Sequence, residues 1–304
     1  MSRSQDALRR AEQERDIWHV VDRQLDQVEA AKFSEPIPIA VEDEEPEAAE
    51  PQPGLPAAKP LTFDAVLARC SRNAWTPDLQ TVLFFGPKES VRGTEEFRAL
   101  RSRLYQLRER QTLKTLLVTS SVPGEGRSFV AANLAQVMAL QPGCRVLLID
   151  ADLRGGRLHR SLGTSATPGL SEYLLNEVEA LDALQKGRPE SLFFIPCGRL
   201  ASGPTELIAN GRFKSLIDRL GPLFDWVIID SSAALPVSDA CLVSICCDGV
   251  LMVVRSASTP FDIVRKAREK FREEQLVGVI LNGSDATSQA HAQYRQGAPE
   301  SFAR

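Results

Sequence analysis

The sequence predicts an α/β fold in which a mostly parallel sheet is covered by helices on both faces. Two observations carry this prediction. Short apolar runs rich in β-branched residues recur from about residue 79 onward. Amphipathic stretches of helical periodicity separate these runs. Strands that alternate with helices in this way form a parallel sheet, because each helix carries the chain back to the edge where the next strand starts.

Composition limits the class of protein. The chain has 304 residues, enough for one sizeable domain with appendages, and its 43% hydrophobic content is ordinary for a globular protein. A net charge of −4 gives no bias toward nucleic acid, so we expect no nucleic-acid partner. No segment is long and apolar enough to span a bilayer, and residues 1–16 lack the apolar core of a signal peptide. We expect a cytoplasmic protein that a partner recruits to the inner face of the cell membrane.

Two appendages precede the expected domain. Residues 1–32 predict a helix, because Ala11, Trp18 and Leu25 recur every seventh residue between charged flanks. This helix either packs on its own domain or binds another protein. Residues 33–78 are rich in proline and glutamate, which is typical of a mostly disordered linker.

The expected domain spans 79–282, and 283–304 form a flexible polar tail. Within the domain, strands are expected at 115–120, 145–150, 192–196, 225–230, 249–254 and 277–282. The clearest helical patterns between them cover 127–141 and 260–275.

A degenerate phosphate-binding loop follows the first of these strands. Residues 120–128 read SSVPGEGRS, in which Ser121 replaces the usual first glycine and Arg127 replaces the usual lysine. A loop between a strand and a helix directs backbone N–H groups and the helix dipole at an anion. Gly124 and Gly126 let the backbone turn, and Ser128 is placed to ligate magnesium.

Three aspartates end neighbouring strand patterns. Asp150 and Asp152 close one apolar run, and Asp230 closes another. Ligands of open α/β sheets bind at the carboxyl ends of the strands, so these side chains should lie beside the phosphate loop. Three carboxylates near a phosphate loop are what a magnesium–nucleotide complex requires.

These motifs resemble the bacterial tyrosine kinases (BY-kinases) of capsular and exopolysaccharide synthesis. This family is related to the MinD-like and ParA-like P-loop ATPases. The resemblance covers about two-thirds of the chain: SSVPGEG, LLIDADLR, WVIID and the upstream EEFRALR, with IPCGRLASGPTELI between the second and third motifs.

The resemblance implies a role for each matching residue. Asp150, Asp230 and Ser128 would hold Mg²⁺, and Asp152 would be the base for a tyrosine hydroxyl. Asn282 matches a position that often contacts the adenine of ATP. The phosphates of ATP would be surrounded by Gly124, Glu125, Gly126, Arg127, Ser128 and Phe129.

The resemblance also implies assembly partners. Glu95, Arg98 and Arg101 of EEFRALR would join copies of the chain into a ring. The expected external partner is a membrane-spanning polysaccharide chain-length (co-polymerase) protein. Tyr294 is the candidate phosphoacceptor, since the family usually carries a cluster of tyrosines in its tail.

The chain departs from the family pattern at three places. Arg127 is a planar fork in place of a compact lysine charge, and it is also the candidate catalytic cation. The loop 231–235 and the glycines Gly155 and Gly156 replace proline-containing segments, which should loosen the rim of the site. The tail offers Tyr294 alone.

Three functions remain open on this basis. The first is an ATP-binding, tyrosine-autokinase-like regulator of polysaccharide export with attenuated activity. The second is a catalytically silent adaptor in which nucleotide stabilises a ring, a reading favoured by Arg127 and the sparse tyrosines. The third, least favoured, is an ATP-hydrolysing switch of the MinD/ParA type, in which EEFRALR has no role.

The six cysteines show no paired metal-ligand spacing, and the three histidines are scattered. We therefore expect the cysteines to be small buried side chains. The sequence predicts no metal site built from cysteine and histidine.

Overall fold

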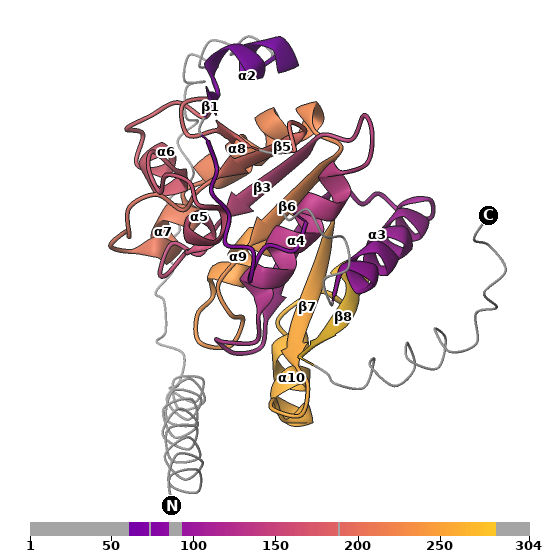
Figure 1. Cartoon of the computed structure of the whole chain (residues 1–304). Coiled ribbons are helices and arrows are strands. Elements are labelled where there is room, and N and C mark those ends of the chain that lie inside the picture. Colours follow the sequence, from indigo (N-terminus) through magenta and orange to yellow (C-terminus); the bar gives the residue numbers. More distant parts are fainter. Residues whose placement is uncertain (1–60, 73, 85–92, 188, 284–304) are drawn as a thin grey trace, which may run out of the picture. The chain divides into compact units, whose positions relative to one another are not determined.

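A single twisted sheet organises the chain. The computed structural model describes residues 61–72, 74–84, 93–187 and 189–283, and within them eight strands form one sheet in the order β1-β4-β5-β3-β6-β2-β7-β8 (Figure 1). Neighbouring strands are parallel except for the antiparallel pair β4 and β5. The strands are β1 (Ser71–Arg72), β2 (Thr115–Ser120), β3 (Val146–Asp150), β4 (Gln185–Lys186), β5 (Leu192–Ile195), β6 (Trp226–Asp230), β7 (Gly249–Arg255) and β8 (Leu276–Asn282).

Helices pack on both faces of the sheet (Figure 1). The described helices are α2 (Phe63–Arg69), α3 (Thr94–Arg108), α4 (Arg127–Ala139), α5 (Leu158–Leu162), α6 (Leu170–Leu174), α7 (Pro204–Ala209), α8 (Arg212–Leu220), α9 (Asp239–Ser244) and α10 (Phe261–Arg268), with short 3₁₀ turns η1 (Gly221–Leu223) and η2 (Glu273–Gln275). Helices α3 and α4 contribute to the core on one face, and α8, α9 and α10 to the core on the other.

Alternating side chains of the central strands divide the core in two. Leu147 and Ile149 of β3 pack on the α8 face, whereas Val146 and Leu148 pack on the α4 face. All four are fully buried. Because both faces of these strands are apolar, the sequence reads as continuous hydrophobic runs, which is typical of parallel sheets.

The predicted fold class is confirmed, and each of the six predicted strands lies within one residue of an observed one. Strands β1 and β4 were not predicted, because two residues are too short to show a periodicity. The expected helix at 260–275 is interrupted: α10 ends at Arg268, and η2 forms separately.

The amino-terminal boundary of the domain was predicted too late. The described structure begins at Leu61, and residues 61–78, assigned above to the linker, include α2 and β1. Thr62 caps α2 by accepting a hydrogen bond from the Ala65 N–H at 3.3 Å. The ring of Phe63 meets those of Phe193 and Phe224 edge-on, with centroids 5.6 and 6.1 Å away. A short capped helix therefore closes one end of the core.

The predicted helix at 1–32 and the tail with Tyr294 lie outside the described residues. Within the described part of the chain, none of the helices has the length and hydropathy that crossing a bilayer would require.

The docking of α2 gives the first testable prediction. Val66 is fully buried in the core, so Val66→Ala should lower the free energy of unfolding by about 2 kcal/mol through lost burial and a residual cavity. Urea unfolding measures the change. The exposed Ala68, two residues along the same helix, provides the control Ala68→Ser, which should stay within about 0.5 kcal/mol of the parent. Equal effects of the two substitutions would show that α2 does not belong to the folded domain.

Candidate active site

The phosphate loop is a sharp turn between β2 and α4. Gly124 and Gly126 adopt φ values of +86° and +93°, a conformation that side chains other than glycine rarely adopt. Gly126 is the N-cap of α4, and no side chain caps the first turn of that helix. The first N–H groups of α4 are therefore free of side-chain caps and available to an anion.

Asn282 holds this loop from the end of β8. Its side-chain amide donates a hydrogen bond to the Glu125 carbonyl at 2.9 Å. A Cβ atom on Gly126 would lie 2.0 Å from the Asn282 amide nitrogen, so only glycine fits here. The structure thus places Asn282 against the backbone of the loop.

Glu125 turns away from the phosphate position into the protein. Its carboxylate accepts hydrogen bonds from the Val122 N–H at 2.9 Å, the Arg255 N–H at 3.1 Å and the Thr259 hydroxyl at 2.5 Å. The residue is only 1% exposed. Its side chain therefore fixes the shape of the loop, and only its backbone faces an anion.

Two of the predicted aspartates are fully buried and adjacent. Asp150 and Asp230 are register partners at the ends of β3 and β6. Asp150 accepts hydrogen bonds from the Leu158 N–H at 3.1 Å and the Asp152 N–H at 3.3 Å, whereas neither carboxylate oxygen of Asp230 has a hydrogen-bond partner in the described structure.

Both aspartates are buried with too few partners to balance their charge, and this raises the pKa of each carboxyl group. Burial raises the pKa of Asp230 to about 7, although the charge of Arg127 and the nearby Ser128 hydroxyl act to lower it. Burial, followed by repulsion from Asp230, raises the pKa of Asp150 well above its ordinary range. The two strand ends therefore form a site that is short of positive charge.

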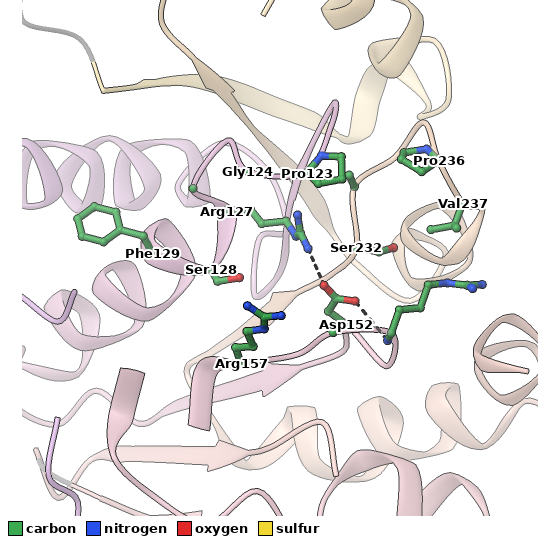
Figure 2. Close-up of a pocket in the computed structure, with 14 residues that line it drawn as sticks. Pro123, Gly124, Arg127, Ser128, Phe129, Asp152, Arg157, Ser232, Pro236 and Val237 are labelled. Atoms are coloured by element: carbon green, nitrogen blue, oxygen red, sulfur yellow. Dashed lines mark hydrogen bonds and ion pairs between the residues drawn. The ribbon is translucent and has the colours of Figure 1, made fainter. Parts of the chain in front are cut away.

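Arg127 reaches from the loop across to both strand ends. One guanidinium nitrogen donates to a carboxylate oxygen of Asp152 at 2.5 Å (Figure 2). Nε donates to the Ser231 carbonyl. The Arg127 and Asp152 side chains are only 14% and 10% exposed. The predicted catalytic base is thus engaged by the arginine that replaces the usual lysine.

The loop after Asp230 is held more firmly than its composition predicts. The Ser231 N–H donates to the Val118 carbonyl at 3.2 Å, and the Ala234 N–H donates to the Ser120 carbonyl at 2.8 Å. The Thr119 hydroxyl also donates to the Ser232 carbonyl at 2.9 Å. These bonds attach the loop to β2 and supply a restraint that the missing prolines would otherwise give.

The other rim of the site is also fixed. Arg154 donates from Nε to Asp239 at 2.7 Å and from its terminal nitrogen to the Thr205 hydroxyl at 2.8 Å, linking this rim to α9 and α7. A Cβ atom on Gly156 would lie 2.6 and 2.7 Å from the Asp150 carboxylate oxygens. The glycine at 156 is therefore required by close packing. The looser rim expected from the sequence is not visible in these contacts.

The phosphate loop, Arg127 and Asp152 border a cavity of about 540 Å³ (Figure 2). That volume falls in the range typical of small-molecule sites. Three arginines, Arg127, Arg154 and Arg157, line it beside Asp152. The remaining lining residues are Pro123, Gly124, Gly126, Ser128, Phe129, Gly155, Ser232, Ala233, Pro236 and Val237.

Most of the predicted site residues converge on this cavity. Gly124, Gly126, Arg127, Ser128, Phe129 and Asp152 line it. Asp150, Asp230, Glu125 and Asn282 do not appear on its wall. Phe129 also packs its ring against Phe97 of α3, with centroids 5.8 Å apart, which ties the loop region to α3.

The predicted oligomerisation residues lie on α3. Glu95 and Arg98 form an ion pair on its surface, and the Glu95 side chain is 62% exposed. Arg101 instead donates to the Val137 carbonyl of α4 at 3.0 Å. Arg101 therefore already has a partner within its own chain.

Sequence reasoning missed three features of the site. The first two are the fixed position of Arg154 and the place of Arg157 on the cavity wall. The third is the approach of His159 and Cys197 to Asp150, which brings together residues that are distant along the chain. The arginines were visible near LLIDADLR, but nothing in their spacing assigned them to a cavity. The scattered positions of the cysteines and histidines along the chain gave no sign that His159 and Cys197 lie together.

The fold and site can be compared with known proteins. Tyrosine-protein kinase YwqD of Bacillus subtilis is 33% identical to this chain over 203 residues, covering 66% of this chain and 84% of YwqD. Tyrosine-protein kinase wzc of Salmonella typhimurium is 35% identical over 190 residues, covering 62% of this chain but only 26% of that longer protein.

The fold of the chain is similar to that of a solved bacterial kinase domain. The solved kinase domain of the Escherichia coli tyrosine kinase ETK is 32% identical to this chain, with a TM-score of 0.60, and the match covers 62% of this chain and 74% of that one. No model of a protein family matches the chain. The extent of the match to YwqD is nevertheless sufficient for an assignment. The chain belongs to the family of bacterial tyrosine-protein kinases.

Proposed function

We propose that this chain is an ATP-binding, tyrosine-autokinase-like protein that regulates capsule or exopolysaccharide synthesis, with attenuated phosphate transfer. One observation carries the proposal: a glycine-turned loop at the start of α4 and Asp152, two residues beyond the end of β3, line the same cavity, and the lining residue Ser128 lies close to the buried Asp230. Family membership supplies the reaction class. The cavity supplies the place where a nucleotide would bind.

The described residues fit a magnesium ion at the strand ends. Asp230 offers two buried carboxylate oxygens without hydrogen-bond partners, and Asp150 lies beside it. Ser128, in the first turn of α4, adds a hydroxyl close to Asp230. Mg²⁺ prefers oxygen ligands, and when bound it would neutralise phosphate charge. A divalent ion would also supply the positive charge that these aspartates lack.

Phosphate transfer at this site would use the protein mainly for positioning. A tyrosine phenol oxygen forms a bond to the γ-phosphorus, the bond from that phosphorus to the bridging oxygen of ADP breaks, and Asp152 takes the phenol proton. The N–H groups at the start of α4 would bind the phosphates. The ion pair with Arg127 occupies one carboxylate oxygen of Asp152 and opposes the protonation of that group.

The Arg127–Asp152 ion pair is the reason for proposing attenuated activity. A lysine in this position would offer a single ammonium, whereas the guanidinium of Arg127 contacts Asp152 and the Ser231 carbonyl at once. Nucleotide can still bind to the loop while the base stays occupied. The same contact favours a second function, the catalytically silent adaptor in which nucleotide controls assembly.

Assembly and recruitment are also proposed from the family resemblance. Glu95 on the exposed surface of α3 is the available part of the ring motif, whereas Arg101 serves α4. The proposed external partner is a membrane-spanning polysaccharide chain-length protein, with residues 1–32 as the contacting segment and the cytoplasmic face of the membrane as the location. Unchanged co-purification after deletion of residues 1–59 would contradict that assignment of the segment.

Exchanging Arg127 separates the two functions. Arg127→Lys should raise tyrosine phosphorylation by at least about tenfold with little change in ATP affinity, because the smaller cation frees Asp152 and can reach the phosphates. Labelled ATP with phosphopeptide mapping, including peptides with Tyr294, measures transfer. The exposed Arg160 of α5 gives the matched control Arg160→Lys, which should behave as the parent.

The outcomes of this experiment differ for each proposal. Label on tyrosine in the parent supports the attenuated kinase. Label that appears only in Arg127→Lys supports the silent adaptor. Binding of magnesium–ATP without label in either protein would contradict kinase activity, and no binding at all would contradict both functions.

The raised pKa of Asp230 predicts a pH effect on stability. Folded Asp230 keeps its proton up to about pH 7, whereas the unfolded side chain loses it near its ordinary value of 3.8. The folded state therefore binds more protons between these values, so stability falls as pH rises through this window. Asp230→Asn should remove this loss of stability. Between pH 5 and pH 8, the free energy of unfolding of the variant should therefore rise relative to that of the parent by an amount on the order of 2 kcal/mol.

Urea unfolding in a metal chelator at pH 5 and pH 8 tests this prediction. Asp218, whose side chain is 59% exposed, provides the control Asp218→Asn with no such pH-dependent difference. A parent-to-variant difference that is the same at both pH values would show that Asp230 is not a buried, charge-deficient carboxylate.

A further inference from the structure

Three side chains with different ligand chemistry meet on the core side of Asp150. The ligand atoms of Asp150, His159 and Cys197 all lie within 4.8 Å of one another. Asp150 ends β3, His159 lies on α5, and Cys197 follows β5 by two residues. Asp150 and Cys197 are 0% and 2% exposed. The fold therefore gathers a carboxylate, an imidazole and a thiol from three separate elements.

The three groups retain free lone pairs. Nδ1 of His159 is buried and has no hydrogen-bond partner in the described structure. The Cys197 thiol approaches only carbonyl oxygens, those of Gly156 at 3.5 Å and Gly198 at 3.4 Å, so its sulfur lone pairs are not used. Each oxygen of Asp150 accepts one backbone N–H bond and can accept another ligand.

Gly156 packs closely against two of these groups. A Cβ atom at this position would lie 2.6 and 2.7 Å from the Asp150 carboxylate oxygens and 2.7 Å from the Cys197 Cβ. The φ of Gly156 is not in the left-handed region, so backbone conformation does not demand glycine here. A side chain at 156 would displace the carboxylate or the cysteine, so glycine is what lets both take their present positions.

We propose that Asp150, His159 and Cys197 bind a divalent transition metal of the zinc class. Thiolate and imidazole select such ions, whereas Mg²⁺ prefers oxygen ligands alone. Three protein ligands with water in a fourth position are a common arrangement around zinc. Zinc–ligand bonds of about 2.0–2.3 Å require these atoms to close in slightly from their present separations, and the Cys197 proton leaves as the metal binds.

The position of this site has a consequence that rests on the proposed function. Asp150 would belong to both the zinc-class site and the proposed magnesium site. A bound transition metal would withdraw Asp150 from magnesium and weaken magnesium–ATP binding. The site would then be inhibitory, and its occupancy would respond to metal supply.

Cobalt(II) is the probe for the site, because thiolate ligation to cobalt gives an intense ultraviolet charge-transfer band. The full chain, stripped of metal and kept reduced, is titrated with cobalt and then with zinc. We expect a band that saturates at one cobalt per chain and disappears as zinc displaces the cobalt. Absence of the band at saturating cobalt overturns the proposal.

Variants assign the band to its ligands. Cys197→Ser should abolish the band, whereas Cys246→Ser, at a partly exposed cysteine outside the cluster, should leave it unchanged. His159→Gln should weaken cobalt binding by at least about tenfold, since even outer-shell losses cost that much. Gly156→Ala should weaken it as well, because the added Cβ would displace Asp150 and Cys197. A band that persists in Cys197→Ser, or an affinity unchanged in His159→Gln, contradicts the assignment.

Circular dichroism of each variant establishes that it is folded. Should Cys197→Ser fail to fold, the comparison of His159→Gln with the parent decides the question, because His159 is only partly buried. Magnesium–ATP binding with and without zinc then tests the shared use of Asp150. Metal binding without any ATP binding would contradict the proposed function alone, and ATP binding without a cobalt band would contradict the metal site alone.

Discussion

The structure around the site depends on two carboxylates that are buried side by side. The registration of β3 with β6 places Asp150 next to Asp230, and neither is accessible to solvent. Two like charges in such a place are unfavourable unless positive charge or protons compensate them. The protein meets this requirement only in part through Arg127, so burial keeps the pKa of each carboxyl above its ordinary range. A metal ion bound at these carboxylates would supply the positive charge that they lack.

Arg127 supplies, from within the protein, part of the positive charge that a bound cation would bring to the site. It belongs to the phosphate loop, yet its contacts are with Asp152 and the loop after β6. A guanidinium stays charged at every accessible pH, and its fork can satisfy a carboxylate and a carbonyl together. Such a residue stabilises the buried carboxylates while competing with the contacts that phosphate transfer would need. Attenuated transfer and retained nucleotide binding are therefore compatible in one structure.

The sequence was sufficient for the sheet and for the edge of the sheet at which most of the predicted site residues meet. Buried parallel strands leave continuous apolar runs, and aspartates at their ends mark the edge where loops converge. Helix α2 was missed because it is short and follows a proline-rich segment whose composition suggested a linker. The inward turn of Glu125 depends on Arg255 and Thr259, which are more than a hundred residues away. The meeting of His159 with Cys197 has no local spacing signal, because a helix and the segment after a distant strand bring them to the same place.

The bonds of Glu125 have an evolutionary consequence. Position 255 donates to this carboxylate through its backbone, so its side chain is free to change without loss of the bond. Position 259 donates through a side-chain hydroxyl, so it can exchange only with serine if the bond is to be kept. Among descendants of this sequence, the bond to Glu125 should restrict position 259 but not position 255, where the Arg255 side chain instead contacts the Gly124 carbonyl at 3.2 Å. A lineage that loses the acid at 125 should release position 259 from that restriction.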